Sequence, residues 1–314
     1  MRVTGGLVLI GGSTASGKSA LALALAERTG GAIVNADSVQ LYRDLPILTA
    51  RPPAAELARA EHHLYGILEA HEASSVAAWL ARLRPVLAGL EAQRRPAILT
   101  GGTGLYFKAL LEGLPAIPEI PPDLRAGLRA DPAPAEALHA RLARLDPLLA
   151  ARLEPGDRQR ILRGLEVVLA TGRKLTDWQG DPPVRPPLPE PCVGIALLPP
   201  ADLVLPRIER RLDAMLEQGV LAELAAFRAR TGDRPTMLSG ADGVAELGAH
   251  LDGRIDLAEA RRLTVIKVRR YAKRQRTFFR GQLAGTLEPH PVAVGPDNLD
   301  ALAAALLEGL RDAT

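Results

Sequence analysis

The sequence predicts an α/β fold in which a parallel sheet is covered by helices on both faces. Four short apolar runs are bounded by turn residues and separated by helical stretches. Each run is apolar throughout, which is typical of strands that are buried on both faces of a parallel sheet. The four predicted strands are Leu7 to Ile10, Ala32 to Val34, Ala97 to Leu99 and Val193 to Leu197.

The first apolar run leads into a glycine-rich loop and then into a helical stretch from Ser19 to Arg28 that ends at Gly30-Gly31. Between a strand and a helix, such a loop turns its backbone amides toward phosphate oxygens, while Lys18 neutralises a terminal phosphate and Ser19 can ligate Mg²⁺. The sequence therefore predicts a P-loop NTPase-like core that binds a polyphosphate. The residues that fit the pattern G-x-x-x-x-G-K-[ST] are Gly12, Ser13, Thr14, Ala15, Ser16, Gly17, Lys18 and Ser19.

The loop by itself does not select one polyphosphate, because kinases, ATPases and transferases with a diphosphate leaving group all need it. Two further strand ends carry polar residues at the edge where open α/β sheets collect ligands. Asp37 follows the second strand and is interpreted as a catalytic carboxylate, a helix N-cap or an outer ligand of a metal. Thr103 follows the third strand, where it contacts a ligand or caps a helix.

Two proline-rich segments divide the chain. Pro115 to Pro122 and Pro182 to Pro191 bracket a largely helical block, and the strand pattern resumes only after the second segment. This pattern predicts a core domain in two parts, residues 1–116 and 188–314, around a small helical insertion domain at 117–187. In the first part, Ser74 to Arg95 is predicted as a helix that Pro85 kinks or divides.

The chain after Pro206 is predicted to be mostly helical. The predicted helices are Arg207 to Arg228, Val244 to His250 and Asp256 to Arg280, and Asp256 suits the N-cap of the last one.

Within that last helix, Lys267 to Arg280 interleaves cations with aromatic residues and contains no acid. Repulsion between neighbouring cations disfavours a helix unless an anion balances it, so this run favours RNA contact over a solvated face. The predicted RNA contacts in the run are Arg270, Lys273 and Arg274, and the predicted core anchors are Tyr271, Phe278 and Phe279.

Composition limits the protein class. With 314 residues, 47% of them hydrophobic, the chain can bury a full core, and no apolar run approaches the roughly 18 residues of a membrane span. The N-terminus lacks the features of a signal peptide, so we expect a cytoplasmic protein without membrane partners. The single cysteine, Cys192, excludes an internal disulfide and a thiolate zinc cluster, and His62 and His63 are interpreted as structural. A net charge of +3 permits an anionic partner without requiring one.

Over nearly its whole length, the chain resembles the tRNA dimethylallyltransferase (tRNA isopentenyltransferase) family. The resemblance implies transfer of a dimethylallyl group from dimethylallyl diphosphate to the exocyclic N6 amine of the adenosine 3′ of the anticodon (tRNA position 37). It implies that the phosphate loop holds the diphosphate and that no phosphoryl group moves. The segments that carry it are Gly12 to Ser19, Asn35 to Tyr42, His62-His63-Leu64, Gly101 to Tyr106, Asp157 to Arg160 through Glu166, Arg207 to Leu216, and Tyr271 to Arg280.

The resemblance also implies roles for single residues. Asp37 is expected to be the general base for the amine, and Thr103 is expected to lie beside that amine. Lys18, Arg211 and Mg²⁺ near Ser19 are expected to stabilise the leaving diphosphate, and an enclosed tunnel is expected to exclude water from the reacting allyl group.

The same resemblance implies contacts with the tRNA anticodon stem-loop, whose target adenosine is flipped into the protein. Charge alone would instead make the arginines at 158, 160 and 163 an ordinary solvated helix face. We expect a monomer. The implied tRNA contacts are Asp37, Ser38, Val39, Gln40, Thr103, Arg125, Gln159, Arg160, Ile161, Leu162 and Arg163.

The chain departs from the family pattern at Ser13, Leu48 and Gly156, where proline, glycine and asparagine are usual. In Gly243-Val244-Ala245-Glu246, a tyrosine and a basic residue that contact tRNA in the family are missing. Three alternatives therefore stay open: a small-metabolite kinase that uses ATP, a prenyltransferase for free adenine nucleotides, and a noncatalytic RNA-binding module. The helical insertion argues against the first two, and the combination of Lys18, Ser19 and Asp37 argues against the third.

Overall fold

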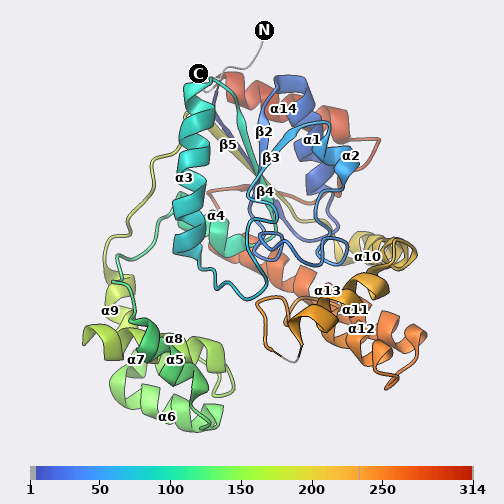
Figure 1. Ribbon diagram of the computed structural model, residues 1–314. Helices are drawn as coiled ribbons and strands as arrows, with labels where there is room; N and C mark the ends of the chain where they lie inside the picture. Colours follow the sequence, from blue (N-terminus) through green and yellow to red (C-terminus); the bar gives the residue numbers. More distant parts are fainter. Residues whose placement is uncertain (1–4, 233, 313–314) are drawn as a thin grey trace. The chain divides into compact units, whose positions relative to one another are not determined.

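The computed structural model describes residues 5–232 and 234–312. Its described part contains a six-stranded sheet in the order β3-β2-β4-β1-β5-β6 (Figure 1). Every neighbouring pair of strands runs parallel, which confirms the predicted α/β class. The strands are β1 (Leu7–Gly12), β2 (Ala32–Asn35), β3 (Glu61–His63), β4 (Ala97–Gly101), β5 (Cys192–Leu197) and β6 (Glu288–His290).

The sequence pattern missed the two edge strands, β3 and β6. Each has only three residues, and their sequences, Glu61-His62-His63 and Glu288-Pro289-His290, contain no apolar run. An edge strand pairs on one side only and stays partly solvated, so it lacks the apolar signature of a central strand. By contrast, all six residues of the central strand β1 are buried.

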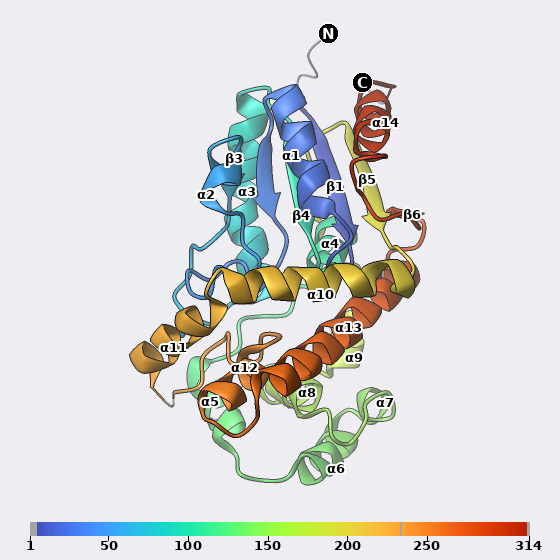
Figure 2. The same cartoon turned by 90° about the vertical axis from the view of Figure 1, so that its right-hand side faces the viewer.

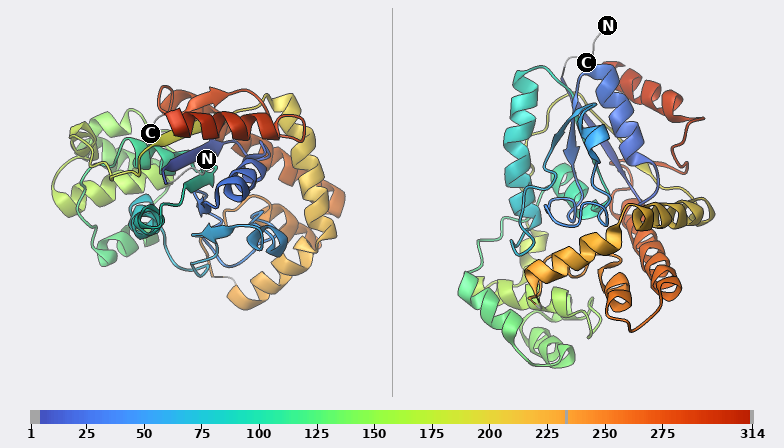
Figure 3. Two further views of the ribbon diagram at one scale, coloured as in Figure 1. Left: turned by 90° about the horizontal axis from the view of Figure 1, so that it is seen from above. Right: turned by 45° about the vertical axis from the view of Figure 1, so that its right-hand side comes forward.

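Helices cover both faces of the sheet, and α3 and α14 lie on opposite sides of it (Figure 3). Residues of α1 and α14 share one core cluster with Val8 and Ile10 of β1. Because side chains alternate along a strand, Gly11 faces the other side, where the ring of Phe279 in α13 lies against it. The helices of this core unit are α1 (Lys18–Thr29), α2 (Ala54–Leu57), α3 (Val76–Ala92), α4 (Gly104–Leu111), α10 (Ala201–Glu217), α11 (Val220–Thr231), α12 (Val244–Leu251), α13 (Leu257–Gln282) and α14 (Leu299–Asp312).

Two helix predictions need correction. Pro85 does not divide its helix, since α3 continues through it for 17 residues from a Ser75 cap whose hydroxyl accepts a hydrogen bond from the amide of Ala78. The predicted helix from Arg207 to Arg228 is two helices, α10 and α11, because Gly219 adopts a φ of 92° between them. The predicted cap of α13 is confirmed, since the Asp256 carboxylate accepts from the amide of Glu259 at 2.8 Å.

The chain divides into two compact units, one formed by Met1–Leu111 with Pro186–Thr314 and the other by Glu112–Arg185. The second unit begins five residues before the predicted position 117, because the backbones of Leu114 and Val184 pair as an antiparallel bridge and bring both connecting segments into it. Its helices are α5 (Pro122–Ala130), α6 (Ala135–Leu145), α7 (Pro147–Ala150), α8 (Arg158–Thr171) and α9 (Leu175–Gly180).

This insertion has its own apolar core, in which Leu142, Ile161 and Leu165 are fully buried. The buried carboxylate of Asp146 accepts hydrogen bonds from the amide of Leu149 at 3.1 Å and from the hydroxyl of Thr176 at 2.8 Å. No helix in the described residues is long and apolar enough to cross a membrane.

The carboxyl ends of β2 and β4 approach closely, and this approach requires glycine at Gly101. A Cβ atom there would lie 2.1 Å from the carbonyl oxygen of Ala36.

We therefore expect Gly101→Ala to lower the free energy of unfolding by about 3 kcal/mol, as overpacking against rigid backbone does. Chemical denaturation monitored by circular dichroism measures this loss. The control is Gly89→Ala in α3, where an added Cβ atom would have no described atom within 4 Å apart from the neighbouring helix backbone. Helix propensity there predicts a gain of about 0.5–1 kcal/mol. Equal effects of the two substitutions would contradict the argument.

Candidate active site

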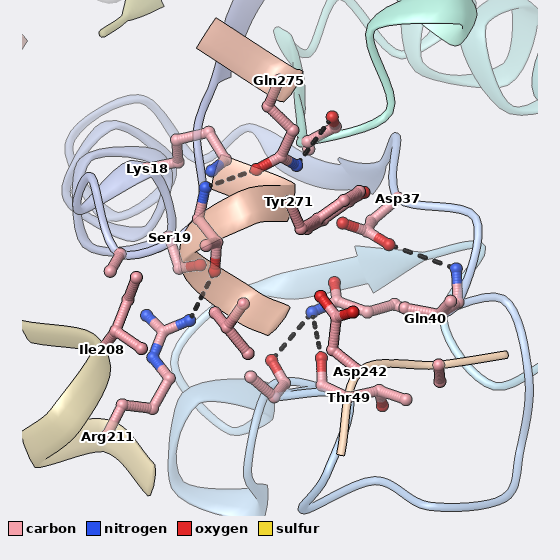
Figure 4. Close-up of a pocket in the computed structure, with 18 of the residues that line it drawn as sticks. Lys18, Ser19, Asp37, Gln40, Thr49, Ile208, Arg211, Asp242, Tyr271 and Gln275 are labelled. Atoms are coloured by element: carbon pink, nitrogen blue, oxygen red, sulfur yellow. Dashed lines mark hydrogen bonds between the residues drawn. The ribbon is translucent and has the colours of Figure 1, made fainter. Parts of the chain in front are cut away.

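A cavity of about 550 Å³ opens at the carboxyl ends of β1, β2 and β4. Helices α10 and α13 cross this end of the sheet (Figure 2) and supply part of the cavity wall. In an open α/β sheet this is the edge where ligands bind. The polar and charged residues that line the cavity include Thr14, Ser16, Lys18, Ser19, Asp37, Gln40, Thr49, Glu56, Arg211, Asp242, Tyr271, Arg274 and Gln275 (Figure 4).

The phosphate loop has the backbone that its glycines predict. Gly17 has a φ of 91° immediately before α1, and a Cβ atom there would lie 2.6 Å from the carbonyl oxygen of Val294. A Cβ atom on Gly12 would lie 2.2 Å from the carbonyl oxygen of Leu197. Both positions need glycine because the loop is enclosed between β5 and the segment that precedes α14.

Six of the eight loop residues, Thr14 to Ser19, line the cavity. Gly12 and Ser13 do not belong to its described lining, and the amide of Ser13 donates instead to the carbonyl of Leu197 at 3.2 Å. Contact of these two residues with diphosphate stays a prediction. The hydroxyl of Ser16 is buried and has no hydrogen-bond partner among the described residues, so it remains available to a ligand.

Two cations accompany the loop. The Lys18 ammonium donates to the carbonyl of Ser13 at 2.6 Å, and burial lowers the pKa of Lys18 to about 7, against the attraction of Asp37. The Arg211 guanidinium on α10 lies 3.4 Å from the hydroxyl of Thr14, and burial lowers the pKa of Arg211 as well. Cations that have lost water and gained few partners bind an anion strongly, so this end of the cavity suits a diphosphate.

Asp37 lines the same cavity as the phosphate loop, and its neighbours fix its position. Its amide donates to the side-chain oxygen of Asn35 at 2.8 Å, and the Trp79 indole in turn donates to the carbonyl of Asn35 at 3.0 Å. Burial raises the pKa of the Asp37 carboxyl, although the Val39 amide, which donates to it at 3.1 Å, and the positive Lys18 oppose that change. A raised pKa makes this carboxylate a stronger base than an exposed aspartate.

The sequence missed two residues of α13 that line the cavity, Tyr271 and Gln275. The Gln275 side chain bridges two strand ends, since its oxygen accepts from the amide of Thr14 at 2.8 Å and its nitrogen donates to the carbonyl of Gly102 at 2.8 Å. Tyr271 was predicted to be a core anchor, which is wrong because its ring lines the cavity near Asp37 (Figure 4). The same prediction is confirmed for Phe279, which is 1% exposed. Tyr271 and Gln275 are four residues apart and therefore lie on one face of the helix, and this spacing was the signal available in the sequence.

Thr103 is placed differently from the expectation. Its hydroxyl accepts from the amide of Ser38 at 2.9 Å, and it is not among the described residues that line the cavity. In this structure Thr103 holds the segment that follows Asp37, and a position beside the reacting amine stays a prediction.

The predicted RNA contacts on α13 are solvent-exposed. Arg270, Lys273 and Arg274 are spaced by three and four residues, so they share one helix face, and Arg274 also reaches the cavity. The Arg274 guanidinium lies 5.6 Å from the centroid of the Tyr271 ring. This face can contact phosphates next to the cavity mouth.

In the insertion, the cations of α5 and α8 surround one buried carboxylate. Glu166 is 3% exposed, and guanidinium nitrogens of Arg125, Arg129 and Arg163 lie 3.8, 3.4 and 3.7 Å from its oxygens. The group has a net positive charge and is partly exposed, as an RNA-binding surface requires.

The side chains of Ile161 and Leu162 are 0% and 8% exposed in the core of the insertion, and the implied tRNA contacts of these two residues stay predictions. Gln159 and Arg160, by contrast, are exposed on the same helix. The surface of α8 that is available to a partner is therefore polar and cationic.

The cavity does not hold a metal by protein ligands alone. Among residues 5–232 and 234–312, no three His, Cys, Asp or Glu side chains gather as a metal site. Ser19, in the first turn of α1, and the carboxylate of Asp242 nevertheless line the cavity. This sparse set of oxygen atoms fits Mg²⁺, which binds through one or two protein oxygens and completes its shell with ligand phosphates and water.

This fold and this cavity define a P-loop protein whose phosphate loop and a half-buried carboxylate line one cavity. The family model for IPP transferase matches residues 40–282. The chain belongs to this family, which confirms the resemblance seen in the sequence.

Curated relatives agree with this assignment. The chain is 48% identical to the tRNA dimethylallyltransferase of Rhodopseudomonas palustris over 306 residues, which cover 96% of this chain and 93% of the relative. It is also 48% identical to the tRNA dimethylallyltransferase of Nitrobacter hamburgensis over 308 residues, which cover 97% of this chain and 95% of the relative.

Solved structures show the same architecture. The full-length tRNA isopentenylpyrophosphate transferase of Bacillus halodurans matches with a TM-score of 0.68 at 31% identity, covering 98% of this chain and 97% of that one. A eukaryotic dimethylallyltransferase acting on tRNA matches with a TM-score of 0.81 at 21% identity, covering 96% of this chain and 78% of that one, and this likeness supports the fold alone.

Burial of the Asp37 charge predicts that Asp37→Asn raises the melting temperature by a few degrees at pH 8. A folded-state pKa above the ordinary value of 3.8 means that stability is lost as pH rises from 3.8 through the folded pKa. The gain from asparagine should therefore be largest at pH 8 and vanish near pH 4. Scanning calorimetry measures it. The control is Asp213→Asn, which should lose stability at pH 8 because Arg261 holds the pKa of Asp213 below its ordinary value.

The low pKa of Lys18 predicts that anion binding is coupled to proton uptake. At pH 8 a group with a pKa of about 7 is mostly neutral, and a neighbouring diphosphate should restore its proton. Titration calorimetry with inorganic diphosphate and Mg²⁺, in buffers of different ionisation enthalpy, measures this uptake. It should approach one proton more than for Lys18→Arg, whose guanidinium stays charged, and should diminish below pH 7. Equal uptake by both proteins would refute the assignment to Lys18.

Proposed function

We propose that this chain transfers the dimethylallyl group of dimethylallyl diphosphate to the N6 amine of the adenosine 3′ of the anticodon in tRNA and releases diphosphate. The observation that carries the proposal is that the phosphate loop and Asp37 line one cavity. One end of the cavity suits a diphosphate and the other presents a base, as alkyl transfer to a weakly nucleophilic amine requires.

At the donor end, the loop amides, Lys18 and Arg211 would hold the diphosphate and stabilise the charge that develops on it. Mg²⁺, held by Ser19 and by phosphate oxygens, would neutralise part of that charge. The partly desolvated Lys18 and Arg211 bind most strongly the species with the highest negative charge, which is the departing diphosphate.

At the acceptor end, Asp37 would accept a proton from the amine while the nitrogen attacks the allylic carbon. The N–C bond forms as the C–O bond to diphosphate breaks, so the electron pair leaves with the diphosphate and the proton remains on Asp37. The Val39 amide, which donates at 3.1 Å, keeps the carboxylate oriented. The raised pKa of Asp37 increases the basicity of this carboxylate.

The acceptor is proposed to be tRNA because cations lie outside as well as inside the cavity. Arg270, Lys273 and Arg274 expose charge beside the cavity, and the insertion exposes Gln159, Arg160 and the arginines that surround Glu166. A flipped adenosine would enter the cavity while these side chains hold the phosphates of the loop. The proposal places the reaction in the cytoplasm and in a monomer.

The family assignment disfavours a metabolite kinase, and tRNA is named in both curated relatives. A prenyltransferase for free adenine nucleotides needs the same cavity but gives no role to the cationic insertion. Substitution of two expected tRNA contacts by Val244 and Ala245 makes this alternative the one to test.

The test incubates the protein and Mg²⁺ with labelled dimethylallyl diphosphate and unmodified tRNA, in parallel with AMP and ATP. We expect transfer to tRNA alone and at least about a 100-fold loss of kcat in Asp37→Ala, the usual range for loss of a general base. Diphosphate binding should persist in the variant, as measured by calorimetry. Transfer to AMP or ATP would reassign the acceptor, and no transfer to any acceptor would overturn the proposal.

A further inference from the structure

Part of the cavity wall belongs to a hydrogen-bonded turn, residues 46–50, and a carboxylate on α11 anchors it. The Glu223 oxygens accept hydrogen bonds from the amides of Ile47 at 2.8 Å and Leu48 at 3.0 Å. Pro46 begins the turn and has no amide hydrogen, so Glu223 caps the first two amides that the turn presents.

The other end of this turn holds Gln40. Its side-chain nitrogen donates to the carbonyls of Thr49 at 2.9 Å and Ala50 at 2.8 Å (Figure 4). A carboxylate at the amide end and an amide donor at the carbonyl end both stabilise the dipole of the turn. Glu223 and Gln40 are thus coupled through four hydrogen bonds and one turn of backbone.

The turn needs such anchors because its own backbone is strained. Leu45, just before the turn, and Ala50, its last residue, have φ values of 54° and 52°, in the left-handed region that residues with a side chain rarely adopt. The backbone amide of Thr49 closes the turn by donating a hydrogen bond of 2.9 Å to the carbonyl of Leu45. A strained segment keeps its conformation only where the surrounding structure fixes it.

Gln40 connects this arrangement to the reacting end of the cavity. Gln40 directly follows Val39, whose backbone amide donates to the Asp37 carboxylate at 3.1 Å. Gln40 also lines the cavity together with Leu48, Thr49 and Ala50. A shift of the turn would therefore move both the cavity wall and the backbone next to a hydrogen bond to the base.

We propose that Glu223 is a positioning residue for the acceptor site, acting through the turn 46–50 and Gln40 on Asp37. The role rests on the proposed function, because Asp37 is a base only if that function holds. Glu223 does not reach the phosphate loop by any described contact, so its effect should be confined to the acceptor side.

Glu223→Gln tests this role, since it keeps the shape of the side chain but replaces one accepting oxygen by an NH2 group. This group cannot accept a hydrogen bond from the amide of Ile47 or Leu48. We expect kcat/KM for tRNA to fall about 10- to 100-fold, with KM for dimethylallyl diphosphate unchanged. The acid limb of the pH profile of kcat should move to higher pH, because Asp37 loses support from the Val39 amide.

The matched control is Arg230→Gln. Arg230 lies on the same helix, α11, and pairs with Asp44 just before the turn; its side chain is 56% exposed and that of Asp44 is 11% exposed. Both variants loosen the hold of α11 on this segment, but only Glu223→Gln removes the cap of the turn. The control should keep the wild-type pH profile and lose less kcat/KM than Glu223→Gln, because the hydrogen bonds from Ile47 and Leu48 to Glu223 stay intact.

Hydrogen exchange of the peptide that contains residues 46–51 supplies a readout without substrates. Protection should be lost in Glu223→Gln and retained in Arg230→Gln. Retained protection in both, or equal losses of kcat/KM in both without a pH shift, would overturn the positioning role. If wild-type protein is inactive on tRNA while the exchange difference appears, the proposed function fails and the anchor stands.

Discussion

The site depends on placing the charges of Lys18 and Asp37 in one cavity. Each charge is disfavoured by burial, which lowers the pKa of Lys18 to about 7 and raises the pKa of Asp37. Their mutual attraction offsets only part of that cost. An anion that binds at Lys18 relieves the rest at one end, and a proton that reaches Asp37 relieves it at the other. The proposed alkyl transfer would supply both.

The sheet makes this placement possible. Parallel strands bring the residues that follow β1, β2 and β4 to one edge. In the sequence, 18 residues lie between Lys18 and Asp37, and 63 lie between Asp37 and Gly101. Gly101 lets two of these strand ends approach, and Gln275 then joins the first and third through bonds of 2.8 Å. Rigid backbone at this edge keeps the charges from relaxing away from each other.

The surrounding helices divide the remaining tasks. Helix α10 contributes Arg211 to the donor end, α13 contributes Tyr271 and Gln275, and α11 holds a wall of the cavity through Glu223. The insertion has its own core and presents its arginines around Glu166. The residues that line the cavity thus belong to the core unit, and the insertion contributes a cationic surface.

The sequence by itself determined the sheet class, the phosphate loop and the position of Asp37, because these follow from local rules: continuous apolar runs, glycines between a strand and a helix, and a polar residue where a strand ends. It also identified the basic helix. It could not assign the faces of that helix, so Tyr271 was taken for a core residue. Gln275 and Glu223 gave no local signal, since each acts by bonding to backbone more than 170 residues away in the chain. The edge strands β3 and β6 likewise needed their neighbours to be recognised. Only the tertiary structure brings such partners together, because hydrogen bonds between distant segments leave no periodic pattern in the sequence.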